Sequence, residues 1–313
     1  MRKPPSAIHR GLTGARLLVG KPYLSDPELR RQYETEIAPR STAALTHLFA
    51  HTPLPSPRRV LDLGAGTGAA GRAAQARWPA SIISSVDRIA GAGTIAADLT
   101  RSGRPPGVEG RFDLIIAAHL LGELALDTDR CARLVLGWCD ELMEKDGHCI
   151  LIEPALRATS RQLLALRDRL VAAQYFVVAP CLWQGPCPAL LRERDFCHAS
   201  AGAIATGRSR VDFSYLVLRR RGTACREQGC FRIVSDPLRS KGRLGLFACG
   251  PAGRLLVTRL DRQRSPANQE MANLARGDLV QIEGATLRAD GLRCTESTVV
   301  RRIPHPEGSR PPT

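Results

Sequence analysis

The chain has 313 residues, about two domains at the usual size of roughly 150 residues each. It carries 45 Lys and Arg against 30 Asp and Glu, a formal net charge of +15, and 43% of its residues are hydrophobic. This composition supports a packed core and excludes a disordered or collagen-like chain. No apolar run approaches the roughly 18 residues that a membrane-spanning helix needs. The first twenty residues predict neither a secretory signal nor a mitochondrial transit peptide, so we expect a cytosolic or matrix protein.

The positive charge is concentrated in the second half of the chain. Residues 1–150 carry 19 basic and 16 acidic residues, a net of +3, whereas residues 151–313 carry 26 and 14, a net of +12. Only four of the basic residues are lysines, and arginine side chains match phosphate oxygens and stack on bases. The asymmetry favours a polyanionic partner, RNA or DNA. An arginine-rich composition serving only solubility is the alternative.

Residues 1–56 are predicted to form an N-terminal helical segment. Ser25 or Asp26 can cap a first helix, since both residue types accept hydrogen bonds from free amides at a helix start. Pro39 is expected to interrupt the helical pattern, because its ring removes an amide donor. Ser41 can then cap a second helix.

Residues 57–222 alternate apolar strands with helices, a spacing that predicts a parallel, doubly wound sheet. The fold class is therefore α/β: a Rossmann-like sheet with a cysteine-rich loop at 179–199. Residues 223–313 hold short strands between glycine turns and predict a small basic β domain, with an OB-like barrel as one form. In the first sheet we expect strands at 60–63, 81–86, 112–118, 147–152 and 212–218, and helices at 69–77, 131–143 and 159–173.

Residues 60–68 read VLDLGAGTG, a strand followed by three glycines at alternate positions and then by a helix. Glycines let the backbone turn tightly and approach a ligand, and the amides of a helix N-terminus face that ligand. Asp87 ends the next strand, where a carboxylate can accept hydrogen bonds from ribose hydroxyls. These features resemble the S-adenosylmethionine-dependent methyltransferase superfamily.

This resemblance implies S-adenosylmethionine as a cofactor. The loop glycines would line its methionine part, Asp87 would bind the ribose, and Asp98 would lie near the adenine. A tight strand–helix turn without a ligand is the alternative. The residues implied in cofactor binding are Asp62, Gly64, Ala65, Gly66, Gly68, Asp87, Asp98, His119 and Leu120.

No catalytic motif is recognisable. Enzymes that methylate base nitrogens often carry an Asn/Asp-Pro-Pro-aromatic loop after the fourth strand, whereas residues 117–123 read AAHLLGE. His119 or Glu123 could act as a base, although packing around the cofactor is the simpler interpretation. Cys181, after Ala-Pro, superficially resembles the nucleophile of cytosine-5 enzymes, but it lacks the preceding Asp and follows the fifth strand. The sequence therefore supports a cofactor fold better than a reaction.

Three of the ten cysteines lie within a Pro- and Gly-rich stretch, in the pattern C-x5-C-x9-C. They are Cys181, Cys187 and Cys197. Cysteines in such a loop do not resemble core residues, unlike Cys131, Cys139 and Cys149, which lie on expected strands and helices. Three local cysteines with a distant fourth fit a four-iron four-sulfur cluster. Zinc, with His198 as the fourth ligand, is the alternative.

The fourth cluster ligand must come from elsewhere in the chain. Cys249 ends an apolar strand directly before a turn, a place from which a side chain can reach a neighbouring domain. We therefore choose Cys249 and rank Cys230 next, with Cys225 and Cys294 as further candidates. A cluster that joined residues 181–197 to Cys249 would fasten the β domain to the first sheet.

Longer motifs resemble one family, the methyltransferase-like proteins that associate with the small subunit of the mitochondrial ribosome, and its bacterial relatives. The similarity covers nearly the whole chain, and the cysteine region is its most specific part. The matching motifs are YLSDP (23–27), RRQY (30–33), APRS (38–41), VLDLGAGTG (60–68), HLLGEL (119–124), LIEP (151–154), PC (180–181), GPCP (185–188), DFCH (195–198) and FSYLVLRR (213–220).

The resemblance implies a four-iron four-sulfur cluster on Cys181, Cys187, Cys197 and Cys249. It also implies that the protein assists assembly of the small ribosomal subunit by binding ribosomal RNA. We expect no membrane partner, a monomer when free, and a bacterial cytoplasmic location, or the mitochondrial matrix in a eukaryote. The main alternative is an active ribosomal RNA methyltransferase that uses His119 or Glu123 as a base. A radical enzyme is disfavoured, because the usual C-x3-C-x2-C spacing is absent.

Overall fold

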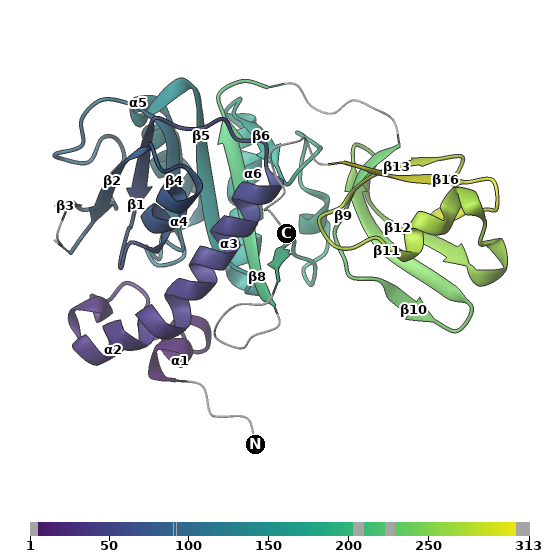
Figure 1. Cartoon of the computed structure of the whole chain (residues 1–313), viewed down its shortest axis with the longest axis horizontal. Helices are drawn as coiled ribbons and strands as arrows, with labels where there is room; N and C mark the ends of the chain where they lie inside the picture. The colour runs from purple at the N-terminus through teal and green to yellow at the C-terminus, as the bar shows by residue number, and fades with distance from the viewer. Residues whose placement is uncertain (1–5, 90, 92, 203–209, 223–228, 305–313) are drawn as a thin grey trace.

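The computed structural model describes residues 6–89, 91, 93–202, 210–222 and 229–304. Its strands form two eight-stranded sheets, which lie toward opposite ends of the long axis of the molecule (Figure 1). Within the described residues, no helix is both long and apolar enough to cross a membrane.

The N-terminal segment is helical, but its breaks differ from the prediction. Asp26 caps a helix start through its Oδ1, which accepts from the amides of Glu28 and Leu29 at 2.9 Å each. Pro39 lies in the first turn of α3, where its missing amide costs nothing, and Ser41 lies buried inside that helix. The helices are α1 (Ala7–Thr13), η1 (Tyr23–Ser25), α2 (Pro27–Gln32), the π-helical turn η2 (Tyr33–Ile37) and α3 (Ala38–His51).

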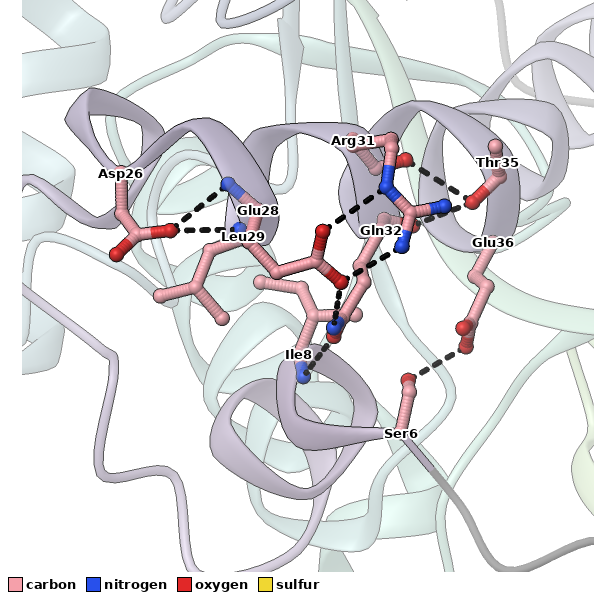
Figure 2. A network of polar contacts seen from close by, with 9 residues as sticks. All are labelled: Ser6, Ile8, Asp26, Glu28, Leu29, Arg31, Gln32, Thr35 and Glu36. Atoms are coloured by element: carbon pink, nitrogen blue, oxygen red, sulfur yellow. Dashed lines mark hydrogen bonds and ion pairs between the residues drawn. The ribbon is translucent and has the colours of Figure 1, made fainter.

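A polar network joins α1 to α2 and to the π-helical turn (Figure 2). Glu28 accepts from Arg31 at 2.7 Å and from the Gln32 amide group at 2.7 Å. Ser6 donates to Glu36 at 2.6 Å, and the amide of Ile8 donates to Gln32 at 3.3 Å. The first helix is therefore fixed to the longer helical run at both its start and its first turn.

The first sheet has the order β3-β2-β1-β4-β5-β8-β6, with β7 paired to β8. The strands from β3 to β5 are parallel, and β8 runs antiparallel to both β5 and β6. The strands are β1 (Arg59–Leu63), β2 (Ile82–Asp87), β3 (Thr94–Ala96), β4 (Phe112–Ala118), β5 (Met143–Pro154), β6 (Phe176–Ala179), β7 (Ala199–Ala201) and β8 (Val211–Arg219). The five strands expected from the sequence are present; β3, β6 and β7 were not expected.

Helices cover both faces of this sheet, as the alternating pattern predicts. On one face, apolar side chains of α5 and α6, including the fully buried Trp138, pack against the strands. On the other face, α3 and α4 contribute Leu45, Phe49 and Ala74 to a second core. Cys131, Cys139 and Cys149 are buried in the first core, which confirms the expected packing role. The helices are α4 (Ala69–Arg77), α5 (Thr128–Leu142) and α6 (Arg157–Ala172).

The second sheet has the order β14-β15-β12-β11-β9-β13-β16, with β10 paired to β11. It has a core of its own, built around Leu246, Val257 and Val280. The strands are β9 (Cys230–Ile233), β10 (Leu238–Ser240), β11 (Arg243–Gly250), β12 (Gly253–Leu260), β13 (Leu279–Glu283), β14 (Thr286–Arg288), β15 (Gly291–Cys294) and β16 (Val299–Ile303). The short helices η4 (Asp261–Gln263) and η5 (Pro266–Ala272) lie between β12 and β13. A further short helix, η3 (Pro188–Leu191), lies in the cysteine-rich loop between β6 and β7.

Candidate functional site

The glycine loop leaves the end of β1 and turns back toward α4. The amides of Gly64 and Ala65 donate to the Val86 carbonyl at 2.8 and 3.0 Å, which fixes the loop against β2. Gly64 has a φ of +72°, and a Cβ there would lie 2.8 Å from the Leu120 side chain. This position therefore requires glycine for both its backbone angle and its close approach.

Asp62 lies beneath this loop. Its side chain is fully buried, and Oδ2 accepts from the Gly71 amide of α4 at 2.9 Å. Burial raises the pKa of Asp62 to about 7, and its Oδ1 has no hydrogen-bond partner among the described residues. The carboxyl group thus positions α4 relative to the loop. Asp62 is not among the described residues that line the cavity near the loop.

A cavity of about 160 Å³ lies above the carboxyl ends of the parallel strands. Asp87 borders it; its Oδ2 accepts from the Gly66 amide at 2.9 Å and its Oδ1 from the Ile89 amide at 3.0 Å. Asp98 also borders it and accepts from Thr100. Of the residues predicted to bind the cofactor, the cavity brings together Gly64, Gly66, Asp87, Asp98, His119 and Leu120.

Two further predicted residues, Ala65 and Gly68, border an adjoining open groove instead. Gly66 and Asp87 line both the groove and the cavity, so the two spaces are neighbours. The glycine loop thus lies between them.

The N-terminal segment covers this cavity, a relationship that sequence reasoning missed. Tyr23, Leu24 and Tyr33 all line it. The Tyr23 hydroxyl donates to Glu123 Oε1 at 2.8 Å, which connects the segment to the loop after β4. The guanidinium of Arg88, next to Asp87, donates to the Gly20 carbonyl at 2.8 Å. Tyr23 belongs to the motif at 23–27, but its partner Glu123 lies 100 residues away, so the spacing of residues does not predict this contact.

His119 stands at the turn after β4 with a φ of +61°, an unusual conformation for a residue other than glycine. Its amide donates to the Ile152 carbonyl of β5 at 2.7 Å. Burial lowers the pKa of His119 to about 4, so the imidazole is neutral at physiological pH. Burial also raises the pKa of the neighbouring Glu123. Burial thus disfavours the charged form of both groups.

A second site lies where the two sheets meet. Cys181, Cys187 and Cys197 of the loop and Cys249 of β11 line one cavity of about 60 Å³. In the sequence, Cys181 and Cys187 precede the short helix η3 and Cys197 follows it. Cys249 is the next-to-last residue of β11. The structure thus brings together the four cysteines that the sequence analysis selected.

Hydrogen bonds from the first sheet hold the loop cysteines in place. Asp168 of α6 accepts from the Cys187 amide at 3.0 Å, and Ser214 of β8 donates to the Cys197 carbonyl at 2.7 Å. The nearly fully buried Arg167 pairs with Asp168 at 2.6 Å and donates to the carbonyls of Trp183 and Gly185. Residues of α6 and β8 therefore hold the loop in its conformation.

Arginines from the second sheet surround the same cavity. Arg232 and Arg254 stand opposite Cys249 on the two neighbouring strands. Arg232 donates to the Pro180 carbonyl, directly before Cys181, and Arg254 forms an ion pair with Asp195 at 2.9 Å. The residues that flank the fourth cysteine thus contact the residues that flank the first and third.

Burial dominates the titration of the four thiols. It raises the pKa of Cys187 to about 12 and that of Cys197 to about 11, and it raises the pKa of Cys181 and Cys249 as well. Nearby guanidiniums act in the opposite direction: Arg254, for example, lowers the pKa of both Cys197 and Cys249. One buried and three half-buried thiols near arginines form a set of sulfur ligands suited to bind a metal cation or an iron–sulfur cluster as thiolates.

The cysteine cavity is lined by thiols, the ligand type that zinc sites and iron–sulfur clusters share. Within the described part of the chain, no group of three or more His, Cys, Asp or Glu side chains is arranged to hold a metal ion. A single zinc would draw its sulfurs to within about 4 Å of one another, given Zn–S bonds of about 2.3 Å. A four-iron four-sulfur cluster is bound by four thiolates, and four cysteines line this cavity.

The other candidate ligands lie elsewhere, with one exception. His198 lines the cysteine cavity; burial lowers its pKa to about 4, and its Nδ1 has no hydrogen-bond partner in the described structure. Cys230 is buried in β9 and Cys294 in the core of the second sheet. Cys225 lies outside the described residues. The described geometry therefore groups Cys249, rather than Cys230 or Cys294, with the loop cysteines.

Comparisons with known proteins place these features in context. Residues 40–263 match the family described as mitochondrial small ribosomal subunit Rsm22. The human ribosome assembly protein METTL17, mitochondrial, is 30% identical over 175 residues, which cover 47% of this chain and 37% of the human protein. The chain therefore spans well under half the length of this curated relative.

Solved methyltransferase structures also match, at low identity. The plantazolicin methyltransferase BpumL in complex with SAH is 11% identical, with a TM-score of 0.42 over 64% of this chain and 93% of that one. The pyocyanin biosynthetic protein PhzM is 15% identical, with a TM-score of 0.41 over 69% and 66% of the two chains.

Proposed function

Because the chain belongs to the Rsm22 family of the mitochondrial small ribosomal subunit, we propose that it is an assembly factor for the small ribosomal subunit. In this proposal it binds ribosomal RNA, S-adenosylmethionine and a four-iron four-sulfur cluster. It works as a monomer when free, in the bacterial cytoplasm or, in a eukaryote, in the mitochondrial matrix.

One observation carries the proposal: three cysteines of the loop between β6 and β7 and one cysteine of β11 line a single cavity. Cys181, Cys187, Cys197 and Cys249 would hold the cluster, whose chemistry is electron storage and the formation of strong thiolate bonds. Because metal–thiolate bonds stabilise the loops that supply them, a cluster here would hold the second sheet against the first. The guanidiniums of Arg232 and Arg254 would offset its negative charge.

The second sheet supplies the RNA-binding surface in this proposal. Residues 151–313 carry a net charge of +12, and many arginines on the second sheet and its connections are exposed. Guanidiniums bind phosphate oxygens through paired hydrogen bonds, and this contact does not depend on base sequence. The exposed basic residues are Arg239, Lys241, Arg262, Arg264, Arg288, Arg301 and Arg302.

The glycine loop would hold S-adenosylmethionine, which supplies an electrophilic methyl group when bound. Asp87 accepts from the Gly66 amide and so fixes the glycine loop, and its carboxylate could also accept from ribose hydroxyls. Asp98, on the opposite wall, would approach the adenine. Tyr23 and Leu24 would close the cavity over the cofactor, since the N-terminal segment already lies there.

Anaerobic purification followed by iron and sulfide analysis tests the cluster. We expect about four irons and four sulfides per chain, with thiolate-to-iron absorption near roughly 400 nm. Cys187→Ser should lose iron and RNA affinity together, whereas the control Cys139→Ala, in the first core, should keep both. One zinc and no iron would replace the cluster by a structural zinc site with His198 as a ligand. RNA binding that survives loss of the metal would contradict the coupling.

An active ribosomal RNA methyltransferase is the second candidate. It is favoured by the position of His119 and Glu123 on the wall of the cofactor cavity. A neutral imidazole can accept a proton as a methyl group is transferred. Comparing the modifications of ribosomal RNA from a deletion strain and its parent decides the matter. A missing methyl group supports this candidate, and identical modification patterns exclude it.

A further inference from the structure

A larger cavity, of about 490 Å³, adjoins the cofactor cavity. Tyr33, His119 and Glu123 line both spaces, so they share a wall. The larger one is bounded by α1, α3, the end of β5 and the start of β8. Its volume is within the range of about 300–1,000 Å³ that small-ligand sites occupy.

Several buried polar atoms in the wall of this cavity have no hydrogen-bond partner among the described residues, and two of them belong to Glu153 and His119. Glu153, at the end of β5, is only 3% exposed. Its Oε1 accepts from the Gly122 amide at 3.1 Å, but its Oε2 has no hydrogen-bond partner among the described residues. The same holds for Nδ1 of His119. Leaving such an atom unpaired costs about 1–3 kcal/mol, so two of them in one cavity point to a missing ligand.

The protonation states of Glu153 and His119 indicate which hydrogen-bonding groups the ligand must offer. Burial raises the pKa of Glu153 to about 8, so at neutral pH its carboxyl group is mostly protonated and can both donate and accept. The neutral His119 ring offers one donor and one acceptor nitrogen. A planar ligand with donors and acceptors along one edge satisfies both groups, and the edge of a nucleobase has this character.

The surroundings of the cavity are basic. Arg10 and Arg210 line it and are exposed, and Arg16 and Arg40 line it with half-buried side chains. Arg210 pairs with two carboxylates, Asp212 at 2.8 Å and Asp236 at 2.9 Å. The arginines favour an anionic ligand, such as one that carries phosphate, over a cationic one.

We propose that this cavity binds a single unpaired nucleotide of an RNA, with its base against Glu153 and His119 and its phosphates at the surrounding arginines. The proposal rests on the proposed RNA-binding function and adds a site that recognises an extruded base rather than a paired one. It requires no chemical step, because binding alone satisfies the two unpaired atoms.

Fluorescence of 2-aminopurine tests the site in the cluster-loaded full chain. One RNA hairpin carries this base as a single-nucleotide bulge, and a matched hairpin carries it paired. We expect a fluorescence change and at least tenfold tighter binding for the bulged hairpin. Glu153→Leu, which removes both polar atoms, should abolish the preference and leave affinity for the paired hairpin unchanged. Glu153→Gln, which keeps a donor and an acceptor, should retain it.

A filling variant and a surface control complete the test. Ala155→Trp, in the cavity wall, should block the base without removing any polar group. Glu144→Gln, exposed on the same strand as Glu153, should behave as the wild type. Thermal melting of each variant shows that it is folded, and the filling variant keeps the test valid if Glu153→Leu is unstable.

The failure of the site and the failure of the proposed function give different results. Equal, tight binding of bulged and paired hairpins, or a bulge preference that survives Ala155→Trp, overturns the site and leaves RNA binding intact. Loss of binding to both hairpins contradicts the RNA-binding function instead. In that case, saturable binding of nucleoside monophosphates that Glu153→Leu abolishes would support the site, and its absence would overturn it.

Discussion

Asp195, two residues before Cys197, forms an ion pair with Arg254, which stands opposite Cys249 in the second sheet; 2.9 Å separate Oδ2 from Nη1. The two side chains are 24% and 16% exposed, so the pair is largely shielded from water. It links the cysteine loop to the second sheet through protein atoms alone. The same two segments that a cluster would join are therefore already in contact.

Breaking this pair should weaken the docking of the second sheet. Asp195→Asn leaves a largely buried guanidinium without its carboxylate, so we expect the free energy of unfolding to fall by about 1–3 kcal/mol. Urea unfolding of this variant, of Arg254→Gln and of the double variant gives the coupling energy. The exposed pair Arg169–Asp129 is the control, and Asp129→Asn should cost less than about 0.5 kcal/mol. Equal losses at the two pairs would show that the Asp195–Arg254 contact has no special role.

The assignment of the fourth ligand gives a second prediction. Cys249→Ala should lose most of the bound iron, because this thiol lines the cavity with the three loop cysteines. Cys230→Ala and Cys294→Ala, whose thiols lie elsewhere in the second sheet, should keep the iron content and the absorption near roughly 400 nm. Iron analysis of the three purified variants decides between them. If Cys230→Ala loses iron while Cys249→Ala retains it, the assignment is wrong.

The cofactor cavity gives a third prediction. Asp87→Asn replaces a carboxylate that borders the cavity and holds the Gly66 amide, so it should weaken binding of S-adenosylhomocysteine about 10- to 100-fold, or about 1.4–2.7 kcal/mol. Asp98→Asn should weaken it less, since Asp98 is exposed and bonded to Thr100. Isothermal titration calorimetry measures both. An unchanged dissociation constant in Asp87→Asn would place the cofactor elsewhere.

Local sequence signals located the first sheet because its features are local. Short stretches of sequence are enough to identify the glycines after β1, the apolar runs and the carboxylate at the end of β2. The same local reasoning misread Pro39, because the preceding π-helical turn lets the proline enter α3 at its first turn without ending the helical run. Short strands such as β3 and β7, of three residues each, have too few side chains to show a period.

Several contacts that form the sites join segments far apart in the chain, so the spacing of residues in the sequence does not predict them. The place of Cys249 before a turn was enough to select it, but the sequence did not predict that Arg232 and Arg254 would lie opposite it in the sheet. Glu153 lies in the motif LIEP, but the cavity that it lines is formed with residues of α1 and α3, which are distant in the sequence. Asp62 was assigned to the cofactor, whereas its hydrogen bond is to α4.

Asp62 also makes the stability of the protein depend on pH. Its pKa of about 7 in the folded chain lies above the value of about 3.9 for an unfolded aspartate, so between these values the folded state binds more protons. Its contribution to stability is therefore complete below about pH 4 and is lost as the pH rises toward about 7. The physical cause is burial, which disfavours the charged carboxylate and leaves its Oδ1 without a partner in the described structure.

Asp62→Asn should remove this dependence, because the amide resembles the neutral acid and can still accept from Gly71. The free energy of unfolding of the variant minus that of the wild type should rise with pH, by at most about 1.4 kcal/mol per pH unit, and level off above about pH 7. Denaturant unfolding at several pH values measures it. Asp98→Asn is a control of opposite sign, because hydrogen bonds from Thr100 lower the pKa of Asp98 and stabilise its charged form. A difference for Asp62→Asn that stays constant with pH would show that this carboxyl group keeps an ordinary pKa.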